Sequence, residues 1–514
     1  MMAVPARAMA GGNRTLVTIC VMLATIMQAL DTSIANVALP HMQGSLQATQ
    51  DQIAWVLTSY IVAAAIATPL TGWLAGRFGR KRLFVACVIG FTFASLLCGI
   101  AETLAQMVVY RLLQGLFGAA LIPLSQATLL DVYPRERHGS AMAIWGSGIV
   151  VAPILGPTLG GYLTDTYTWR WVFYINLPVG ILTIAGIALF VAETKLDRER
   201  PFDFFGFATL SLCIGALQMM LDRGETNDWF GSTETWIELG LCITGLWVFL
   251  VHAATAEHPF VSLALFKDRN FVAGSVLMFL IGILLYGTLA LLPPLLQQLM
   301  NYPVVTTGLV LGPRGLGTLV AMGVVGRLTG KIDARLILAI GFSVTAYSLW
   351  RMTGYSLDMD MWPVITITIL QGFGLGLVWV PLSAASFYTL PVELRTEGSA
   401  FSSLVRNIGG SIGIAVGENV LVRNIQINHA AIAAHANPYN PMMQIPSVHH
   451  AWNMTTTTGL AALNAEVTRQ ASMIAYLDVF KLLMILTIAL IPLLLLLRDT
   501  RGGGGGRGPA PALD

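Results

Sequence analysis

One long apolar segment contains the run Gly148-Ile149-Val150-Val151-Ala152-Pro153-Ile154-Leu155-Gly156-Pro157-Thr158-Leu159-Gly160-Gly161. Its small residues recur every fourth position, at Gly148, Ala152, Gly156 and Gly160, which places them on one face of a helix. A face without bulky side chains lets another membrane helix approach closely. Pro153 and Pro157 remove backbone donors and bend a helix, which lipid tolerates only where neighbouring helices satisfy the freed carbonyls. The run therefore predicts either a helix at a pivoting interface or an ordinary tightly packed helix pair.

The composition of the whole chain is that of a polytopic membrane protein. Hydrophobic residues make up 55% of the 514 residues and charged residues only 11%, and the mean hydropathy is +0.70. Apolar stretches of about 20 residues indicate transmembrane helices. They predict an all-α protein with spans near 15–38, 52–75, 83–101, 104–130, 140–164, 171–192, 203–221, 235–254, 270–298, 304–326, 335–352, 362–389, 398–422 and 475–497, fourteen in total. The first span is too long for a cleaved signal peptide, so we expect it to be retained.

The positive charges predict the orientation, because loops rich in Lys and Arg stay in the cytoplasm. Most of the 29 Lys and Arg residues fall on the side of the N-terminus, in clusters at Arg77/Arg80/Lys81/Arg82, Arg135/Arg137, Lys195/Arg198/Arg200, Lys267/Arg269 and Arg327/Lys331/Arg335. Both termini are therefore expected in the cytoplasm. The basic residues serve topology, so the net charge of +2 does not indicate a nucleic-acid partner.

The two ends of the chain repeat each other. Gly72-Trp73-Leu74-Ala75-Gly76-Arg77 recurs as Gly326-Arg327-Leu328-Thr329-Gly330-Lys331, and Gln114-Gly115 recurs as Gln371-Gly372. Gly139-Ser140-Ala141 likewise recurs as Gly398-Ser399-Ala400. Both copies of each element face the same side, which predicts two parallel six-span halves, with a substrate site between them near the middle of the bilayer.

The repeats divide the chain into the following parts: a cytoplasmic N-terminus (1–14), a first half (15–192), two inserted spans (203–254), a second half (270–498) with an outer, periplasmic loop (about 425–474), and a flexible cytoplasmic tail (499–514). The outer loop is polar, and we expect it to cover the outer mouth or to contact a partner.

Charges inside a membrane are costly, so each is a functional candidate. Asp31 lies in the first span and Arg111 in the fourth, both roughly 12 Å from the outer ends of their helices. We expect them to meet. Because a nearby Arg changes the proton affinity of a carboxylate, such a pair supplies the minimum for coupling transport to protons. A static buried ion pair that fixes helix register is the alternative.

Other polar residues accompany this pair in the predicted spans. Gln28, Thr32 and Asn36 form a stripe with Asp31, and Gln114 shares a face with Arg111; both sets are candidates for a substrate cavity. Arg314, Arg406 and Asn407 lie in later spans. Each of these arginines is a candidate either for binding an anionic group or for contacting a neighbouring helix carbonyl.

Several chemistries lack their residues in this chain. No Walker-type loop, His-Glu-x-x-His motif or Gly-x-Ser-x-Gly elbow is present, which argues against ATP-driven transport and the common membrane hydrolases. The histidines of the outer loop, including His449 and His450, match no strong metal-binding pattern, and the five cysteines have no metal-ligand spacing. We expect a transporter rather than an enzyme, with no metal and no cofactor.

Taken together, these motifs resemble the major facilitator superfamily, and within it the fourteen-span drug:proton antiporters of the EmrB type. Leu30-Asp31-Thr32-Ser33-Ile34-Ala35-Asn36-Val37-Ala38-Leu39-Pro40 is similar to the family's first-span motif, Arg111-Leu112-Leu113-Gln114-Gly115 to its fourth-span motif, and the run from Gly148 to Gly161 to its antiporter motif. Leu221-Asp222-Arg223-Gly224 with Asp228-Trp229-Phe230 resembles the exporter signature between the two extra spans. The resemblance covers nearly the whole chain.

The resemblance implies the major facilitator fold and export of hydrophobic or amphipathic drugs across the inner membrane, driven by proton entry. It also implies a periplasmic membrane-fusion adaptor and an outer-membrane channel as partners. Three alternatives differ in function: a dedicated exporter of one metabolite (a siderophore, antibiotic or lipid precursor), a non-transporting membrane sensor or scaffold, and an uptake symporter. The antiporter motif argues against the last.

The resemblance further implies a cytoplasmic gating motif at Gly72, Arg77, Gly79, Arg80 and Lys81. This chain departs from the motif at Gly76, where the superfamily has an acidic residue. A gating ion pair that needs this acid is therefore not expected, whereas the basic residues can still contact a helix end or lipid phosphates.

Overall fold

The computed structural model describes residues 11–53, 55–134, 137–194, 196, 201–328, 332–437, 440–445 and 452–497, and the regular elements in these ranges are helices. Most of the N-terminal segment, the tail at 499–514, the basic residues Arg135, Lys195, Arg198, Arg200 and Lys331, and the histidines His449 and His450 lie outside the described residues. The all-α fold expected from the sequence is confirmed.

The N-terminal half comprises α1 (Gly11–Ser45), α2 (Gln50–Ile53), α3 (Trp55–Ala67), α4 (Leu70–Phe78), α5 (Arg80–Gly99), α6 (Leu104–Gly118), α7 (Leu121–Val132), α8 (His138–Thr166), α9 (Trp171–Tyr174) and α10 (Asn176–Phe190). The inserted pair comprises α11 (Phe204–Arg223) and α12 (Thr233–Thr255), with the short 3-10 helix η2 (Trp229–Gly231) between them.

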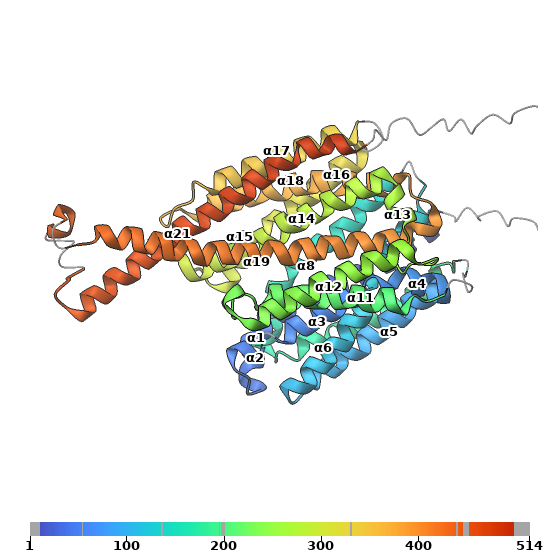
Figure 1. The fold of residues 1–514 in the computed structure, drawn as a ribbon, viewed down its shortest axis with the longest axis horizontal. Helices are drawn as coiled ribbons and strands as arrows, with labels where there is room; N and C mark the ends of the chain where they lie inside the picture. Colours follow the sequence, from blue (N-terminus) through green and yellow to red (C-terminus); the bar gives the residue numbers. More distant parts are fainter. Residues whose placement is uncertain are drawn as a thin grey trace, which may run out of the picture.

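The C-terminal half comprises α13 (Ala264–Lys267), α14 (Arg269–Pro294) with the π-helical turn η3 (Leu295–Leu299), α15 (Val304–Leu311), α16 (Pro313–Leu328), α17 (Ala334–Met352), α18 (Met361–Tyr388), the 3-10 turn η4 (Val392–Leu394), α19 (Arg395–His435), the 3-10 turn η5 (Pro441–Gln444) and α21 (Thr457–Leu490) with η6 (Pro492–Leu496). In Figure 1 the long helices lie roughly side by side; α11 packs against α3 and α19, and α12 packs against α11.

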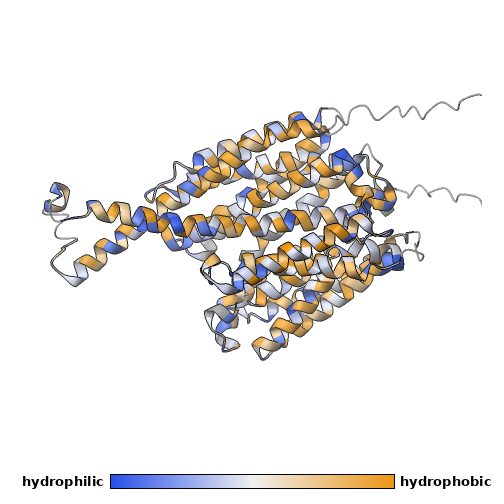
Figure 2. Cartoon of the chain, viewed as in Figure 1, coloured by the Kyte–Doolittle hydropathy of each residue, from blue (hydrophilic) through white to orange (hydrophobic). Residues whose placement is uncertain are grey.

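Each predicted span coincides with one helix or with two consecutive helices. Ten helical segments of the described chain are long and apolar enough to cross a membrane, and α3 with α4, bent by 57° at their junction, makes an eleventh. The remaining three predicted spans are the long helices α8, α17 and α19. Helix α19 is less apolar because its stretch 398–417 contains Arg406, Asn407 and many serines and glycines. Figure 2 shows hydrophobic residues over most of the bundle.

The structure shows the internal repeat in its packing. Gly115 on α6 lies against the carbonyl of Tyr60 on α3, and Gly372 on α18 lies against the carbonyl of Arg314 on α16. The register that aligns Gly72 with Gly326 also aligns Tyr60 with Arg314. In each half, a glycine therefore brings the same two helices into backbone contact.

The repeat also governs the boundary between the halves. Gly72 on α4 lies against Glu397 at the start of α19, and Gly326 on α16 lies against Ser140 at the start of α8. Ser140 additionally donates a hydrogen bond to the carbonyl of Gly326 (3.1 Å). The two halves thus meet through two repeat-related contacts at the same end of the bundle. We call this end, where α4 finishes and α5, α8 and α19 begin, the basic end.

The segment expected as an outer loop is largely helical where the structure describes it. Helix α19 continues to His435 and α21 begins at Thr457, and together they project beyond the other helices (Figure 1). The physical reason is local composition, because the Ala-rich stretch at 430–434 favours helix whether or not it is apolar enough for lipid.

Candidate functional site: a buried charge network and a polar cluster at the basic end

Asp31 and Arg111 meet, as the sequence predicts. The Nη1 of Arg111 lies 2.6 Å from Oδ2 of Asp31, and neither side chain is exposed to solvent (0% each). The other carboxylate oxygen, Oδ1, accepts hydrogen bonds from Nε2 of Gln114 (2.8 Å) and Nδ2 of Asn176 (2.9 Å). The network joins α1, α6 and α10 and gives both carboxylate oxygens a partner, which a buried charge requires.

Arg111 is held from a fourth helix as well. Its Nε donates to the carbonyl of Val56 on α3 (3.0 Å), and its guanidinium lies 4.3 Å from the ring centroid of Tyr60, a cation–π distance. Through these contacts and its ion pair with Asp31, the buried Arg111 links the first, second, fourth and sixth spans. A change in the charge of Asp31 would therefore act on several helices at once.

The predicted polar stripe on α1 does not gather into one site. Gln28 donates to the hydroxyl of Tyr60 (3.2 Å), so it borders the network. Thr32 bonds instead to the carbonyl of Ala29 on its own helix, and Asn36 is exposed. The carboxylate of Asp31 is dry and fully partnered rather than part of a wetted stripe.

The antiporter-like run lies on α8 and packs against the helix that carries Asp31. A side chain at Gly148 would collide with Met22, and one at Gly156 would collide with Ser33, both on α1. Gly160 is buried, whereas Gly161 faces open space. The helix runs from His138 to Thr166, and the side chains of Pro153 and Pro157 lie outside the described residues. The tight helix pair predicted from the small residues therefore forms, with α1 as partner.

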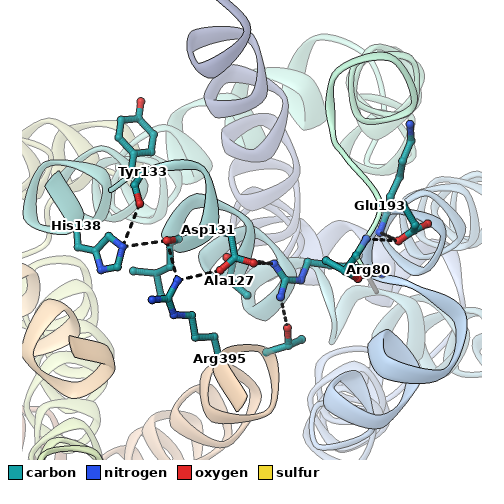
Figure 3. Close-up of polar contacts among 11 residues, drawn as sticks. Arg80, Ala127, Asp131, Tyr133, His138, Glu193 and Arg395 are labelled. Atoms are coloured by element: carbon teal, nitrogen blue, oxygen red, sulfur yellow. Dashed lines mark hydrogen bonds and ion pairs between the residues drawn. The ribbon is translucent and has the colours of Figure 1, made fainter. Parts of the chain in front are cut away.

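A second polar cluster closes the basic end (Figure 3). Asp131 on α7 is paired with Arg80 on α5 through one oxygen and with Arg395 on α19 through the other (2.9 Å). Arg80 also donates to the hydroxyl of Thr396 (2.8 Å), and Arg395 donates to the carbonyl of Leu130 (3.0 Å). One carboxylate of the N-terminal half thus binds an arginine from each half.

The cluster shows what replaces an acid at position 76. An ion pair does bridge the halves at this motif, but its acid is Asp131 at the end of the fourth span, not a residue at position 76. Among the motif residues, Arg80 enters this pair and Gly72 lies against Glu397. Arg77 is exposed and borders a surface groove of about 550 Å³ with Phe78 and Arg82.

Gly79 and Lys81 have a structural part in the same motif. Gly79 has φ +91°, a conformation that favours glycine, and the carboxylate of Glu193 lies directly against it. Glu193 accepts the backbone N–H of Lys81 (3.0 Å) and of Arg82 (3.3 Å), so a negative charge caps the start of α5. The turn thereby fixes the position of Arg80.

Two further arginines are buried in the C-terminal half. Arg314 is 9% exposed and Arg406 is 4% exposed, and within the described ranges neither has an ion-pair partner. The guanidinium of Arg406 lies 5.3 Å from the ring centroid of Trp379, and its contact with Asn407 is long (3.5 Å). Asn407 accepts from Ser411 through its backbone carbonyl (3.2 Å). In the part of the chain that the structure describes, no group of three or more His, Cys, Asp or Glu side chains is placed to hold a metal ion.

Sequence reasoning missed Asn176, Tyr60 and Asp131. Asn176 opens α10 and there resembles an ordinary helix cap, and Asp131 ends α7, where an acid is expected to face water. These residues could have been found by searching each neighbouring span for a polar residue at the same depth in the membrane as Asp31.

Comparison with known proteins agrees with this architecture. A sequence model of the Major Facilitator Superfamily matches residues 21–414. The chain belongs to this superfamily. It is 35% identical to the multidrug export protein EmrB of Escherichia coli K12, over 97% of this chain and 98% of that protein. It is 38% identical to the fatty acid resistance protein FarB of Neisseria gonorrhoeae, over 95% of this chain and 97% of that protein.

The solved structure of the proton:xylose symporter XylE has the same fold. It superimposes with a TM-score of 0.59 at 14% identity, over 96% of this chain and 97% of the symporter. The resemblance to EmrB-type major facilitator proteins and the fold expected from it are confirmed, and the chain is a multi-pass membrane transporter.

Proposed function

We propose that this transporter exports small hydrophobic and amphipathic drugs across the inner membrane in exchange for protons. The observation that carries the proposal is the fully buried carboxylate of Asp31, paired with Arg111 and bonded by Gln114 and Asn176. Full-length similarity to proteins named for multidrug export supports the choice of substrate. The proton gradient is the proposed energy source, with no further cofactor.

The carboxylate couples protons to helix movement through its hydrogen bonds. Protonation removes the charge that Arg111 neutralises and turns one acceptor oxygen of Asp31 into a donor. That oxygen then no longer suits the donors that face it, which are the amides of Gln114 and Asn176 at Oδ1 or the guanidinium of Arg111 at Oδ2. The first, fourth and sixth spans lose their common anchor, and α8, which lies against α1, moves with it.

The cluster at the basic end acts as the gate. In the proposed orientation both termini are cytoplasmic, so Asp131 with Arg80 and Arg395 joins the halves on the cytoplasmic side. Drug binding from the cytoplasm requires this cluster to separate, and release to the outside occurs while it is joined. Arg80 and Arg395 can donate hydrogen bonds whether the halves are joined or separated. Both arginines bind the carboxylate of Asp131 only when the halves are joined, so this carboxylate stabilises the joined state.

The proposed partners are a periplasmic adaptor and an outer-membrane channel. The projecting parts of α19 and α21 are suited to such a contact, because they extend the protein well beyond the bundle on the side opposite the basic end. A dedicated exporter of one metabolite is the second candidate, and the similarity to a relative named for fatty acid resistance favours it.

The experiment is dye transport into inverted membrane vesicles energised by a proton gradient, with wild type and Asp31→Asn compared. Uptake that collapses in the variant and with an uncoupler supports a proton-driven exporter with Asp31 in the coupling path. Unchanged uptake in the variant removes Asp31 from the mechanism. Absence of uptake of every dye by folded wild type favours the single-metabolite exporter or a non-transporting protein.

A further inference from the structure

The boundary between the halves contains an unusual concentration of buried donors around Arg406. Trp145 on α8 belongs to the N-terminal half and Trp379 on α18 to the C-terminal half, and their ring centroids lie 6.2 Å apart. Both indoles are buried (0% and 7% exposed), and among the described residues neither indole N–H has a hydrogen-bond partner. The Nε of Arg406 also has none. The three donors lie on α8, α18 and α19, and both Trp145 and the guanidinium of Arg406 lie beside the ring of Trp379.

A buried guanidinium without a carboxylate is costly, and so is each unpaired N–H. Arg111 shows which acceptors the same fold gives a buried arginine: a carboxylate, an amide oxygen and a backbone carbonyl, which together leave only its Nη2 without a partner among the described residues. In the described chain, Arg406 has only the face of Trp379 and the long contact to Asn407. Among the described residues, no carboxylate pairs with Arg406, so a negatively charged acceptor from a ligand would complete its environment.

We propose that Arg406, with the indoles of Trp379 and Trp145, binds the anionic group of an amphipathic substrate, such as the carboxylate of a hydrophobic weak acid. The two indoles come from opposite halves, so they separate when the halves part. The space between them then admits an apolar body, while Arg406 and the indole N–H groups bind the charged head. Met322, which lies against Gly146 beside Trp379, extends the apolar wall.

The proposal rests on the proposed export function and narrows its substrate class. An anion that leaves while a proton enters moves charge in the same direction as the proton. Exchange of this substrate class is consequently electrogenic, and it is driven by the membrane potential as well as by the pH gradient. Exchange of a monovalent cation for one proton would be electroneutral.

The test compares two probes that differ only in charge: a dansyl-labelled undecanoic acid and its methyl ester. Binding of each is measured at neutral pH by fluorescence anisotropy, with the full chain in lipid nanodiscs. We expect wild type to bind the acid at least about ten-fold more tightly than the ester, which corresponds to one charge-assisted hydrogen bond. Arg406→Gln is expected to remove this preference, and Arg406→Lys to retain part of it. Equal binding of acid and ester by wild type overturns the proposal.

Two further variants keep the result interpretable. Arg351→Gln removes an exposed arginine at the end of α17 and should leave the preference unchanged. Trp379→Phe keeps a ring and deletes one indole N–H, so it should weaken binding of the acid a few-fold and leave binding of the ester unaffected. If Arg406→Gln does not fold, the result for Trp379→Phe is the test of the site. If folded Arg406→Gln still prefers the acid over the ester as wild type does, the proposed site is wrong. If Arg406→Gln does not fold, an unchanged preference in Trp379→Phe has the same meaning.

Transport distinguishes this proposal from the proposed function. Proton-driven dye export by a protein that binds acid and ester equally means that the function stands and the anion site fails. Preferential binding of the acid by a protein that transports no dye means that the site stands and multidrug export fails. Electrogenicity is measured in proteoliposomes whose membrane potential is clamped with potassium and valinomycin. If the rate of acid transport does not depend on the clamped potential, the substrate is not transported as an anion.

Discussion

Gly115 in the N-terminal half and Gly372 in the C-terminal half each press a helix against the backbone carbonyl of a neighbour, Tyr60 in one case and Arg314 in the other. The helix contact is repeated, but the charges around it are not. The N-terminal half contains Arg111 with its own carboxylate, Asp31, whereas in the described residues Arg314 and Arg406 of the C-terminal half have none. In the proposed mechanism, this difference assigns proton chemistry to the N-terminal half and leaves the C-terminal half with positive charge available to a ligand.

The largest expected effect tests whether the two arginine environments really differ. Arg111→Ala leaves the carboxylate of Asp31 buried and unpaired, which should cost about 3–5 kcal/mol of stability. Arg406→Ala strands no carboxylate, so its cost should be much smaller. The measurement is the thermal unfolding midpoint of each purified variant in detergent. Similar losses in both variants would end the distinction between the halves.

A paired substitution serves as the control for Arg111. Asp31→Asn combined with Arg111→Gln removes both charges and keeps groups that can hydrogen bond. It should recover most of the lost stability, because the cost comes from an unpaired charge rather than from lost packing. The double variant should remain unable to couple transport to protons.

The next effect tests the part of the comparison that is the same in both halves. Gly115→Ala and Gly372→Ala each place a methyl group against a backbone carbonyl, and each should destabilise the protein by about 1–3 kcal/mol. Gly161→Ala is the matched control, since nothing lies within 4 Å of its added carbon. Unfolding midpoints again provide the measurement, and a loss confined to one half would show that the repeat-related contacts are not equivalent.

A smaller effect concerns the amide donors of the proton site. Asn176→Ala removes one hydrogen bond to Asp31 and one to Ser95 (2.9 Å), and should cost about 1–2 kcal/mol. Ser95→Ala removes the second bond and the bond that Ser95 donates to the carbonyl of Phe173 (2.9 Å), and it leaves the bond from Asn176 to Asp31 in place. We expect Asn176→Ala to shift the pH profile of dye transport and Ser95→Ala to leave it in place. Identical profiles for both variants would make Asn176 a structural residue only.

The sequence predicts the parts of this molecule that hydropathy and membrane charge determine. Asp31 and Arg111 can be identified from the sequence because charges in apolar spans are rare, and counting residues along each helix places both at the same depth in the membrane. Gly148 and Gly156 are legible because small residues at helical spacing form a packing face. The pairing of α8 with α1, rather than with another span, depends on tertiary packing and cannot be read from spacing.

Residues at helix ends show where such prediction stops. Asp131 looks like a solvated acid until α19 brings Arg395 beside it, and Asn176 looks like a cap until α10 packs against α1. The projecting hairpin, formed by the end of α19 and the start of α21, was predicted as a loop because hydropathy locates lipid-facing helices and not helices in water. Ala-rich sequence near 430–434 carried the helical signal instead.

The smallest expected effect concerns the gate, which breaks the symmetry between the two repeat-related contacts at the basic end. In the part of the chain that the structure describes, the contact of α19 with the N-terminal half has an acid between two arginines, whereas α8 and α16 meet through Ser140 and Gly326. Asp131→Asn removes the charge but keeps an oxygen acceptor, so it should weaken the joined state by about 1 kcal/mol and raise the separated population about five-fold.

Thiol labelling measures that population. Ala143→Cys places a reporter at the buried contact with Gly326, and the five native cysteines are buried, which keeps the background low. Asp131→Asn should increase the labelling rate of this reporter. Glu466→Gln, which removes an acid paired with Arg469 on the projecting hairpin, should not. The reporter sits at the contact of α8 with α16, where the described residues form no ion pair. Faster labelling there would mean that the halves part as rigid bodies, and an unchanged rate would mean that α19 moves alone.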